Sequence, residues 1–444
     1  MATLLSKSLV QLLRPLLVLL VSAPLMLMIL SVETEPTVSN SAPFNQDERS
    51  QIEQLLLDGA PQSPQSMSLQ RLQLNADELN LLLRYSIGVM NLSPRWAARL
   101  ALNENTLTSA LSVNLGQRLM PLFLNLQMEF IGSGNLLKFA SLQIGKLKVP
   151  EVFLQYALSR IRASLESSNT VYQDFNLLLS RVQQVTVSPD RIDVELVWDP
   201  ILISNISNHA QQLFISDQDQ QRIMDYYRRI GEIAAAIPSD LRAVSLNAFL
   251  VPLFTAAVEK SRSGSDPVAE NRTLFQALAI YINNENIEQL IGVELAESLP
   301  NPKLIEVRLR RRQDLAQHLV AMAAITASAG ADLAQMLATT KEAYDARYRS
   351  GFSFSDLAAN TVGVTMAGHS TRDARSARLM QERLANLQNE ADYMPTVGNN
   401  RDGLSESDFN AIYQNRSSEE YQQRLSEIQE LINARPLFRD LPVR

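Results

Sequence analysis

The 444-residue chain contains no cysteine. This absence excludes disulfide bonds, thiolate metal ligands, a cysteine nucleophile and the lipidated cysteine of a bacterial lipoprotein. Histidine is scarce as well, with three residues, so imidazole chemistry is confined to few positions. The chain also lacks the HExxH, GxSxG, GxxxxGK(S/T) and strand-linked GxGxxG patterns that mark several large enzyme and nucleotide-binding classes. No established catalytic motif is therefore present in the sequence.

An excess of positive charge is missing too. Lysine and arginine total 40 against 47 aspartate and glutamate residues, which gives a formal net charge of -7. Because phosphate binding needs a net basic face, this balance argues against a nucleic-acid partner. A hydrophobic content of 46% with 20% charged residues is typical of globular proteins, and the length predicts at least two domains.

One long apolar run stands near the N-terminus. Residues 8–32 carry a single charge, Arg14, and exceed the roughly 20 residues needed to cross a bilayer. Lys7 precedes this run and Glu33 follows it, so the positive-inside rule leaves the N-terminus in the cytoplasm. We therefore expect a single-pass signal anchor in a bacterial inner membrane, with the bulk of the chain in the periplasm.

A cleaved signal peptide is the competing interpretation. Val21-Ser22-Ala23 offers a small-residue cleavage site, but cleavage there would cut the apolar run in the middle. We favour the uncleaved anchor for that reason.

The rest of the chain divides by composition and hydrophobic period. Residues 33–67 are polar and contain several prolines, which predicts a linker with one short helix. Residues 68–205 predict an α+β domain in which an antiparallel sheet packs against helices. From residue 206 the sequence consists of helical segments separated by loops, which predicts an all-helical domain at 206–444.

The pattern within the first domain is specific enough to place elements. Asn75 and Glu78 have the spacing of a capping box that opens a helix. Apolar residues then alternate with polar ones, which predicts four antiparallel strands before Pro150. The further expected elements are a helix that begins at Pro150, a helix at 171–182 and a strand at 192–198.

These segments carry a family resemblance. Over residues 68–165 the chain resembles the YpmS-like family of anchored extracytoplasmic bacterial proteins, with matching positions at Glu78-Leu79-Asn80 and in the IGKLKVP segment. The resemblance implies a location outside the membrane and a similar fold. It does not indicate any activity, because none is established for the family. An apolar groove under a curved sheet would suit a lipid, whereas the same apolar face is normally just the core, and both interpretations stay open.

A second group of motifs lies between Arg308 and Gly368. It consists of RRRQDLAQH, TTKEAYDA and SGFSFSDLAANTVG, set among alanine-rich helical segments. These motifs resemble the YfiM-like family of small bacterial envelope proteins. This resemblance does not indicate any activity. The matching positions are Asp314, His318, Lys341, Glu342, Asp345, Phe352, Ser353, Asp356, Leu357, Asn360 and Gly363.

Helical spacing favours the convergence of these polar residues. Glu342 and Asp345 stand at i and i+3, and Asp356 and Asn360 at i and i+4, so each pair shares one helix face. The cluster that would form if the faces meet comprises His318, Lys341, Glu342, Asp345, Asp356 and Asn360. A divalent metal is one possible cofactor, with His318, Glu342, Asp345 and Asp356 as its ligands. A carboxylate beside a histidine would also serve acid–base chemistry.

Each of these residues has a structural explanation as well. The pairings to weigh are a Ser353–Asp356 capping box, Lys341 with Asp345, Glu342 with Arg347 or Arg349, and the arginines of 308–312 with nearby acids or with anionic lipid headgroups. A buried hydrogen-bond network, a metal or catalytic site, and unrelated surface groups all stay open.

We expect a non-enzymatic envelope protein that binds or scaffolds in the periplasm, with the inner membrane and a lipid or another envelope protein as partners. One alternative is a metal-dependent or acid–base hydrolase centred on His318, Glu342, Asp345 and Asp356. The other is a lipid carrier that uses the sheet domain.

Overall fold

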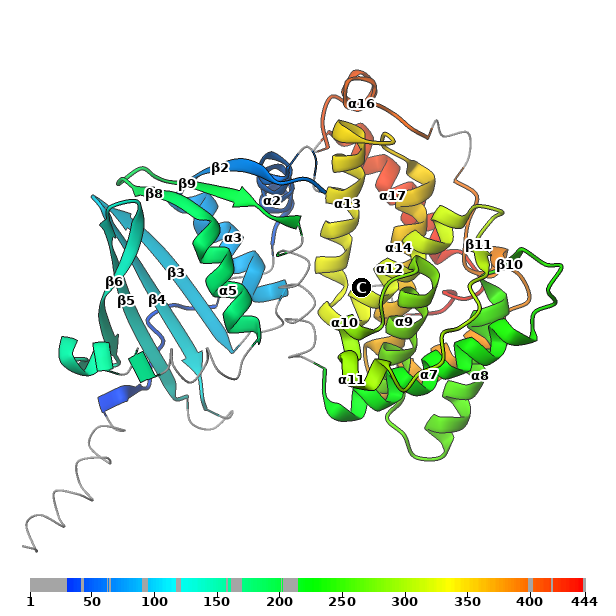
Figure 1. Ribbon diagram of the computed structural model, residues 1–444. Coiled ribbons are helices and arrows are strands. Elements are labelled where there is room, and N and C mark those ends of the chain that lie inside the picture. Colours follow the sequence, from blue (N-terminus) through cyan, green and yellow to red (C-terminus); the bar gives the residue numbers. More distant parts are fainter. Residues whose placement is uncertain are drawn as a thin grey trace, which may run out of the picture. The chain divides into compact units, whose positions relative to one another are not determined.

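The chain forms two compact units, each described by itself. The computed structural model describes residues 30–40, 44–61, 63, 65–89, 95–116, 121–156, 159–160, 170–200, 202, 215–397, 402–416 and 418–441 (Figure 1). The first unit comprises residues 1–44 and 63–202, and the second comprises 45–62 and 203–444. The predicted mixture of helices and antiparallel sheet is confirmed.

The expected membrane anchor lies almost entirely outside the described residues, which begin at residue 30. Within the described part of the chain, no helix is long and apolar enough to cross a membrane.

The first unit contains a six-stranded antiparallel sheet. Its main path runs β3 (Trp96–Asn103), β4 (Thr106–Asn114), β5 (Phe123–Ser133), β6 (Leu136–Ile144) and β7 (Leu147–Lys148). The four strands predicted before Pro150 are thus confirmed. β1 (Val32–Glu33) pairs with the first residues of β5, Phe123 and Leu124, whereas β6 pairs with β5 only from Leu126 onward.

A second sheet was not predicted. It has three antiparallel strands in the order β2 (Ser68–Asn75), β9 (Arg191–Trp198) and β8 (Val182–Val187). Only β9 was expected, because the apolar residues of β2 and β8 do not alternate strictly. The single sheet of the sequence-based prediction is therefore wrong.

Helix α3 (Ala76–Val89) begins at the predicted capping box. The Asn75 side chain accepts from the Glu78 backbone N–H at 2.9 Å, and the Glu78 carboxylate accepts from the Asn75 N–H at 2.9 Å. The Asn80 carboxamide then bonds both backbone groups of Leu100, which fixes α3 against β3. The other described helix of regular length in this unit is α5 (Thr170–Arg181), close to its predicted bounds.

The core of the first unit lies between α3 and the two sheets. Leu102, Val187 and Ile192 are buried there, and partly buried apolar side chains from both sheets and from α3 pack around them. The apolar side chains of β5 (Leu124, Leu126, Met128 and Phe130) are half-buried and lie outside this buried cluster, so the core and groove interpretations of the sheet face both stay open.

The second unit is helical. Its helices are α2 (Gln46–Gly59), α7 (Asp217–Ala236), α8 (Asn247–Arg262), α9 (Pro267–Asn283), α10 (Glu288–Ile291), α11 (Val293–Ala296), α12 (Gln313–Ala329), α13 (Ala331–Tyr348), α14 (Phe354–Thr371), α15 (Ala374–Ala385), the 3-10 helix η1 (Glu390–Asp392), α16 (Glu406–Tyr413) and α17 (Glu419–Asn433). The prediction of an all-helical domain is wrong in one detail, since β10 (Ala243–Ser245) and β11 (Glu306–Arg308) form a parallel pair.

Helix α2 differs from the prediction in its role. The short helix is present, but it belongs to the helical unit and not to a linker. Ile52 and Leu57 are buried, and the Asp58 carboxylate accepts from Arg347 at 2.9 Å. Its apolar side chains therefore dock it against α13, which a proline-flanked segment does not reveal by composition.

Helices α12 and α14 cross closely and set the position of the site. Gly363 on α14 lies against the Leu319 carbonyl of α12, where a Cβ atom would stand 2.2 Å from that oxygen. Glycine at this position therefore allows the two helices to approach closely. Beside this crossing, the rings of Phe352, Phe354 and Phe409 contact one another and Tyr413 in edge-on or tilted arrangements and close the core.

Candidate functional site

The six predicted cluster residues meet at the junction of three helices. His318 comes from α12, Asp356 and Asn360 come from α14, and the remaining three come from α13. A chain of direct contacts links all six, as the following paragraphs describe. The convergence that helical spacing favoured is therefore present in the structure.

The loop between α13 and α14 fixes the position of the start of α14 relative to the end of α13. Gly351 adopts φ +89 and packs on Gly403, where a Cβ would lie 2.4 Å from the Gly403 carbonyl carbon. Phe352 and Leu404 exchange backbone hydrogen bonds at 2.7 and 3.0 Å. This clamp fixes Ser353, whose side chain caps α14 by accepting from the Asp356 N–H at 3.1 Å.

The predicted Ser353–Asp356 capping box is only half formed. The reciprocal bond is absent from the described contacts, because the Ser353 backbone N–H donates to Glu342 Oε2 at 3.3 Å instead. Glu342 thereby takes the place that the capping carboxylate would fill, and Asp356 turns toward His318. The suggested pairing of Glu342 with Arg347 or Arg349 does not occur among the described contacts, since Arg347 binds Glu406 at 3.1 Å and Arg349 lies over the Tyr344 ring.

Asn360 connects the histidine to the buried carboxylate. Its Nδ2 donates to Glu342 Oε1 at 3.2 Å, and its Oδ1 lies 3.0 Å from His318 Nδ1. Since an amide oxygen only accepts, Nδ1 must carry the proton, and the lone pair of the imidazole stays on Nε2. This arrangement orients the free nitrogen away from Asn360.

The Nε2 atom of His318 faces one acidic residue and one basic residue. Asp356 Oδ2 lies 3.6 Å away and Lys341 Nζ lies 3.4 Å away. Lys341 also binds Asp345 Oδ2 at 2.8 Å, so the predicted Lys341–Asp345 pair is confirmed. Asp345 reaches the histidine only through the lysine.

Three of the four predicted metal ligands form a tight group. One ligand atom each from His318, Glu342 and Asp356 lie within 4.8 Å of one another. Asp345 stands outside this group because its carboxylate is held by Lys341. The predicted four-residue ligand set is thereby reduced to three residues.

Burial perturbs the ionisation of the three residues. Desolvation raises the pKa of Glu342 to about 8, against the opposing effect of the Lys341 charge. Desolvation also raises the pKa of Asp356, while His318 and Arg312 act to lower it. The pKa of His318 is lowered by desolvation and by the neighbouring ammonium of Lys341.

Arg312 is the residue that sequence reasoning left outside the site. Its guanidinium binds Asp356 at 2.7 Å, Asp314 at 2.6 Å and Asp402 at 2.9 Å. The general expectation that the arginines of 308–312 pair with nearby acids is thus confirmed for Arg312. The proximity of Asp314 in sequence gave a signal, whereas Asp402 lies 90 positions away and gave none.

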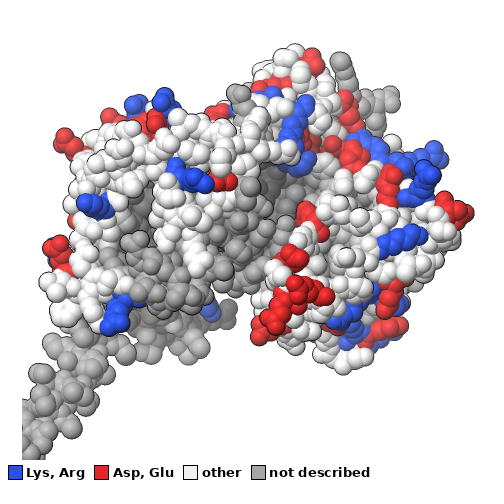
Figure 2. All heavy atoms as spheres, in the orientation of Figure 1, with Lys and Arg blue, Asp and Glu red and all other residues white. Residues whose placement is uncertain are grey.

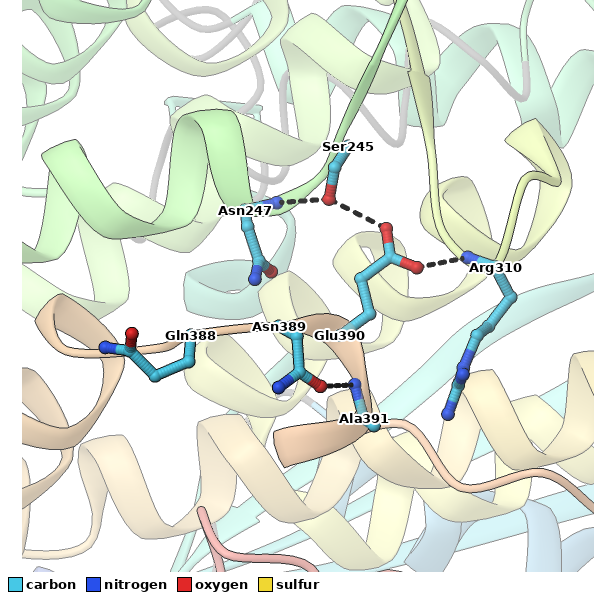
Figure 3. A pocket seen from close by; sticks show the side chains of 7 residues that line it. All are labelled: Ser245, Asn247, Arg310, Gln388, Asn389, Glu390 and Ala391. Atoms are coloured by element: carbon cyan, nitrogen blue, oxygen red, sulfur yellow. Dashed lines mark hydrogen bonds between the residues drawn. The ribbon is translucent and has the colours of Figure 1, made fainter.

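A separate pocket of about 490 Å³, open to solvent, lies elsewhere in the second unit (Figure 3). Its lining residues are Ser245, Asn247, Arg310, Gln388, Asn389, Glu390 and Ala391. Glu390 forms its wall, accepting from Ser245 Oγ and from the Arg310 backbone N–H at 2.7 Å each. Both oxygens of this carboxylate are therefore engaged, and Figure 3 shows it lying between the two donors.

The charged side chains of the helical unit are mixed on the surface. On the face shown in Figure 2, its acidic and basic residues are interspersed within the described part of the chain. Both signs therefore occur on the same surface.

Comparison of the chain with protein-family models, with curated proteins and with solved structures gave no match. The two family resemblances stay predictions, and the function rests on the geometry of the site.

Proposed function

We propose that the protein is a membrane-anchored extracytoplasmic binding protein whose helical unit holds a divalent transition-metal ion at His318, Glu342 and Asp356. The observation that carries this proposal is the approach of their ligand atoms to within 4.8 Å of one another. One imidazole and two carboxylates form a mixed nitrogen and oxygen donor set, which suits ions such as Zn²⁺ and Mn²⁺.

The surroundings of His318 support this proposal. Histidine ligands in metal sites usually donate their second ring N–H to an oxygen, which fixes the ring orientation. Asn360 supplies that oxygen at 3.0 Å from Nδ1, so Nε2, which lies 3.6 Å from Asp356 Oδ2, is available as the ligand atom, while Glu342 Oε1 lies 3.8 Å from Nδ1. Asp356 is held in turn by Arg312, as carboxylate ligands commonly are.

The Lys341 ammonium group lies beside the proposed ligands, next to the position that a metal ion would occupy. Its ammonium contacts Nε2 of His318 at 3.4 Å and would repel an arriving metal ion. The side chain is 47% exposed, so it can turn into solvent when an ion binds. We therefore propose that Lys341 and the metal ion compete for the same ligands.

Burial favours binding over hydrolysis. Only 1% of the Glu342 side chain is exposed, and a general acid or base must reach its substrate directly or through one water. The acid–base alternative draws on one observation, the rise of the Glu342 pKa to about 8, which would keep a proton available near neutral pH. The lipid-carrier alternative draws on the half-buried apolar side chains of β5, among them Leu126, Met128 and Phe130.

Metal analysis tests the proposal. The full chain is purified from membranes, stripped with a chelator, incubated with Zn²⁺ or Mn²⁺ and analysed for bound metal. We expect one ion per chain in the wild type and none in His318→Ala, whereas His369→Ala on α14 keeps the ion. Equal metal content in the wild type and His318→Ala would show that the cluster is a structural hydrogen-bond network.

A further inference from the structure

We propose that the helical segment at residues 151–156 docks on the surface of the membrane next to the N-terminal anchor. The inference rests on the anchor of the proposed function and adds a second point of attachment. Phospholipid at the membrane surface is the occupant to which we commit.

The end of the apolar run is held by the turn between β6 and β7. The Lys146 backbone N–H donates to the Leu30 carbonyl at 2.9 Å. Gly145 adopts φ +54 in this turn, and a Cβ there would stand 2.6 Å from the Leu30 oxygen and 2.8 Å from the Ser31 oxygen. The close approach requires glycine, and it ties the exit point of the expected anchor to one end of the sheet.

The same turn leads directly into the exposed helical segment. Val152 lies six positions after Lys146, so the chain between them spans at most about 20 Å. Figure 1 shows the short teal helix at the end of the sheet where β1 lies. A membrane entered at residue 30 would therefore lie within reach of this helix.

The segment exposes an apolar surface that a soluble helix would cover. Val152 is 79% exposed, Phe153 67% and Tyr156 61%, while Leu154 is buried in the unit. These three residues stand at i, i+1 and i+4, so they form one side of the helix. Aromatic and aliphatic side chains in this arrangement insert at the boundary between headgroups and acyl chains, where tyrosine is enriched.

Basic residues flank this apolar surface. Lys146 and Lys148 precede it, and Arg160 follows it with its guanidinium 5.5 Å from the centre of the Tyr156 ring. One acidic residue, Glu151, lies among them in the sequence, and a second, Glu33, follows the Leu30 exit point on β1. Within residues 146–160, three basic residues stand against one acidic residue. This local positive charge suits anionic phospholipid headgroups better than an uncharged apolar protein surface.

Site-directed spin labelling tests the inference, and the absence of cysteine makes single labels straightforward. Phe153→Cys in the full chain is labelled with a nitroxide and reconstituted in vesicles of phosphatidylcholine and phosphatidylglycerol at three to one. We expect the label to be relaxed more strongly by oxygen than by a water-soluble nickel chelate. The matched control is Leu136→Cys at the opposite end of β6, about 26 Å along the strand, where the nickel chelate should dominate.

A third label separates the two proposals. Leu17→Cys lies in the apolar run and should favour oxygen if the anchor spans the bilayer. A buried Leu17 label with a water-exposed Phe153 label would overturn the docking inference alone, whereas water exposure of both would overturn the anchor itself. Spin–spin broadening at Phe153 in vesicles would show that a second copy of the chain covers the surface, and would also overturn the inference.

Discussion

The Nδ1 atom of His318 lies 3.0 Å from the Oδ1 atom of Asn360. The other end of the same carboxamide donates to Glu342 at 3.2 Å. One side chain therefore sets both the tautomer of the histidine and the orientation of the buried carboxylate. Because α12, α13 and α14 each contribute one of these three residues, Asn360 also ties the three helices together.

We expect Asn360→Leu to destabilise the helical unit strongly. The substitution keeps the branched shape and the number of heavy atoms, but it leaves the His318 N–H and a Glu342 oxygen without their partner in a buried site. Each unsatisfied group costs about 1–3 kcal/mol, so the free energy of unfolding should fall by about 2–5 kcal/mol. Urea unfolding followed by circular dichroism, in the presence of a chelator, measures the change.

Thr361→Val is the matched control for this substitution. Thr361 is buried one position further along α14, and its hydroxyl donates to the Leu357 carbonyl of the same helix at 2.8 Å. Loss of that bond should cost less than about 1 kcal/mol, because the carbonyl keeps its helical partner. Similar losses in the two variants would contradict the linking role of Asn360.

The raised pKa of Glu342 predicts a pH dependence of stability. Burial raises its pKa to about 8, above the value of about 4.3 in an unfolded chain. The folded state then binds this proton more tightly, so its contribution to stability is complete below about pH 4.3 and is lost as the pH rises through 8. In metal-free protein the wild type should lose stability between pH 5 and pH 8.

Glu342→Gln isolates that contribution. Glutamine cannot ionise, and its single oxygen can replace only one of the two that accept from Asn360 and from the Ser353 N–H. Glu342→Gln should therefore be less stable than the wild type at pH 5, and this difference should shrink or reverse by pH 8. Glu232→Gln on the exposed face of α7 should leave the pH profile unchanged. Parallel profiles for wild type and Glu342→Gln would show that Glu342 is already ionised at pH 5.

Much of the site could be predicted from local spacing. The i and i+4 relation of Asp356 and Asn360 places both on one side of α14, and both do face His318. The i and i+3 relation of Glu342 and Asp345 was less informative, because it does not show which of the two carboxylates joins the group around His318. That choice depends on how deeply α13 packs, which is a tertiary property.

Long-range pairing accounts for what the sequence did not reveal. Asp402 reaches Arg312 only because the loop at Gly403 packs on Gly351. The pairing of β10 with β11 joins two three-residue strands about sixty positions apart, too short to show a hydrophobic period. Local rules describe a helix face or a strand, but not which distant segment it meets.

Gly363→Ala tests the helix crossing that brings His318 to Asn360. An added Cβ would lie 2.2 Å from the Leu319 carbonyl oxygen and 3.1 Å from the Ala323 nitrogen, both backbone atoms. Overpacking of this kind costs about 1–3 kcal/mol, which should outweigh the gain of up to about 1 kcal/mol from better helix propensity. Gly231→Ala on α7 is the control, because its Cβ would meet Pro302 at an ordinary 3.7 Å and should stabilise the unit. Thermal unfolding of both variants gives opposite shifts if the crossing is as close as described.

Lys341→Met tests the competition between the lysine and a metal ion. The ammonium lies 3.4 Å from the ligand nitrogen of His318, and its charge lowers the histidine pKa. Removing it takes away a repulsive charge and frees the Asp345 carboxylate, so both effects should strengthen binding of a divalent cation. Solvent screening of the half-exposed side chain limits the gain, and we expect about a tenfold tighter Kd for Zn²⁺, which corresponds to about 1.4 kcal/mol. Calorimetric titration measures it, with Lys303→Met as the control because that lysine binds the Ile237 carbonyl away from the site. Weaker binding in Lys341→Met than in Lys303→Met would show that the lysine supports the ligand group and does not compete with the ion.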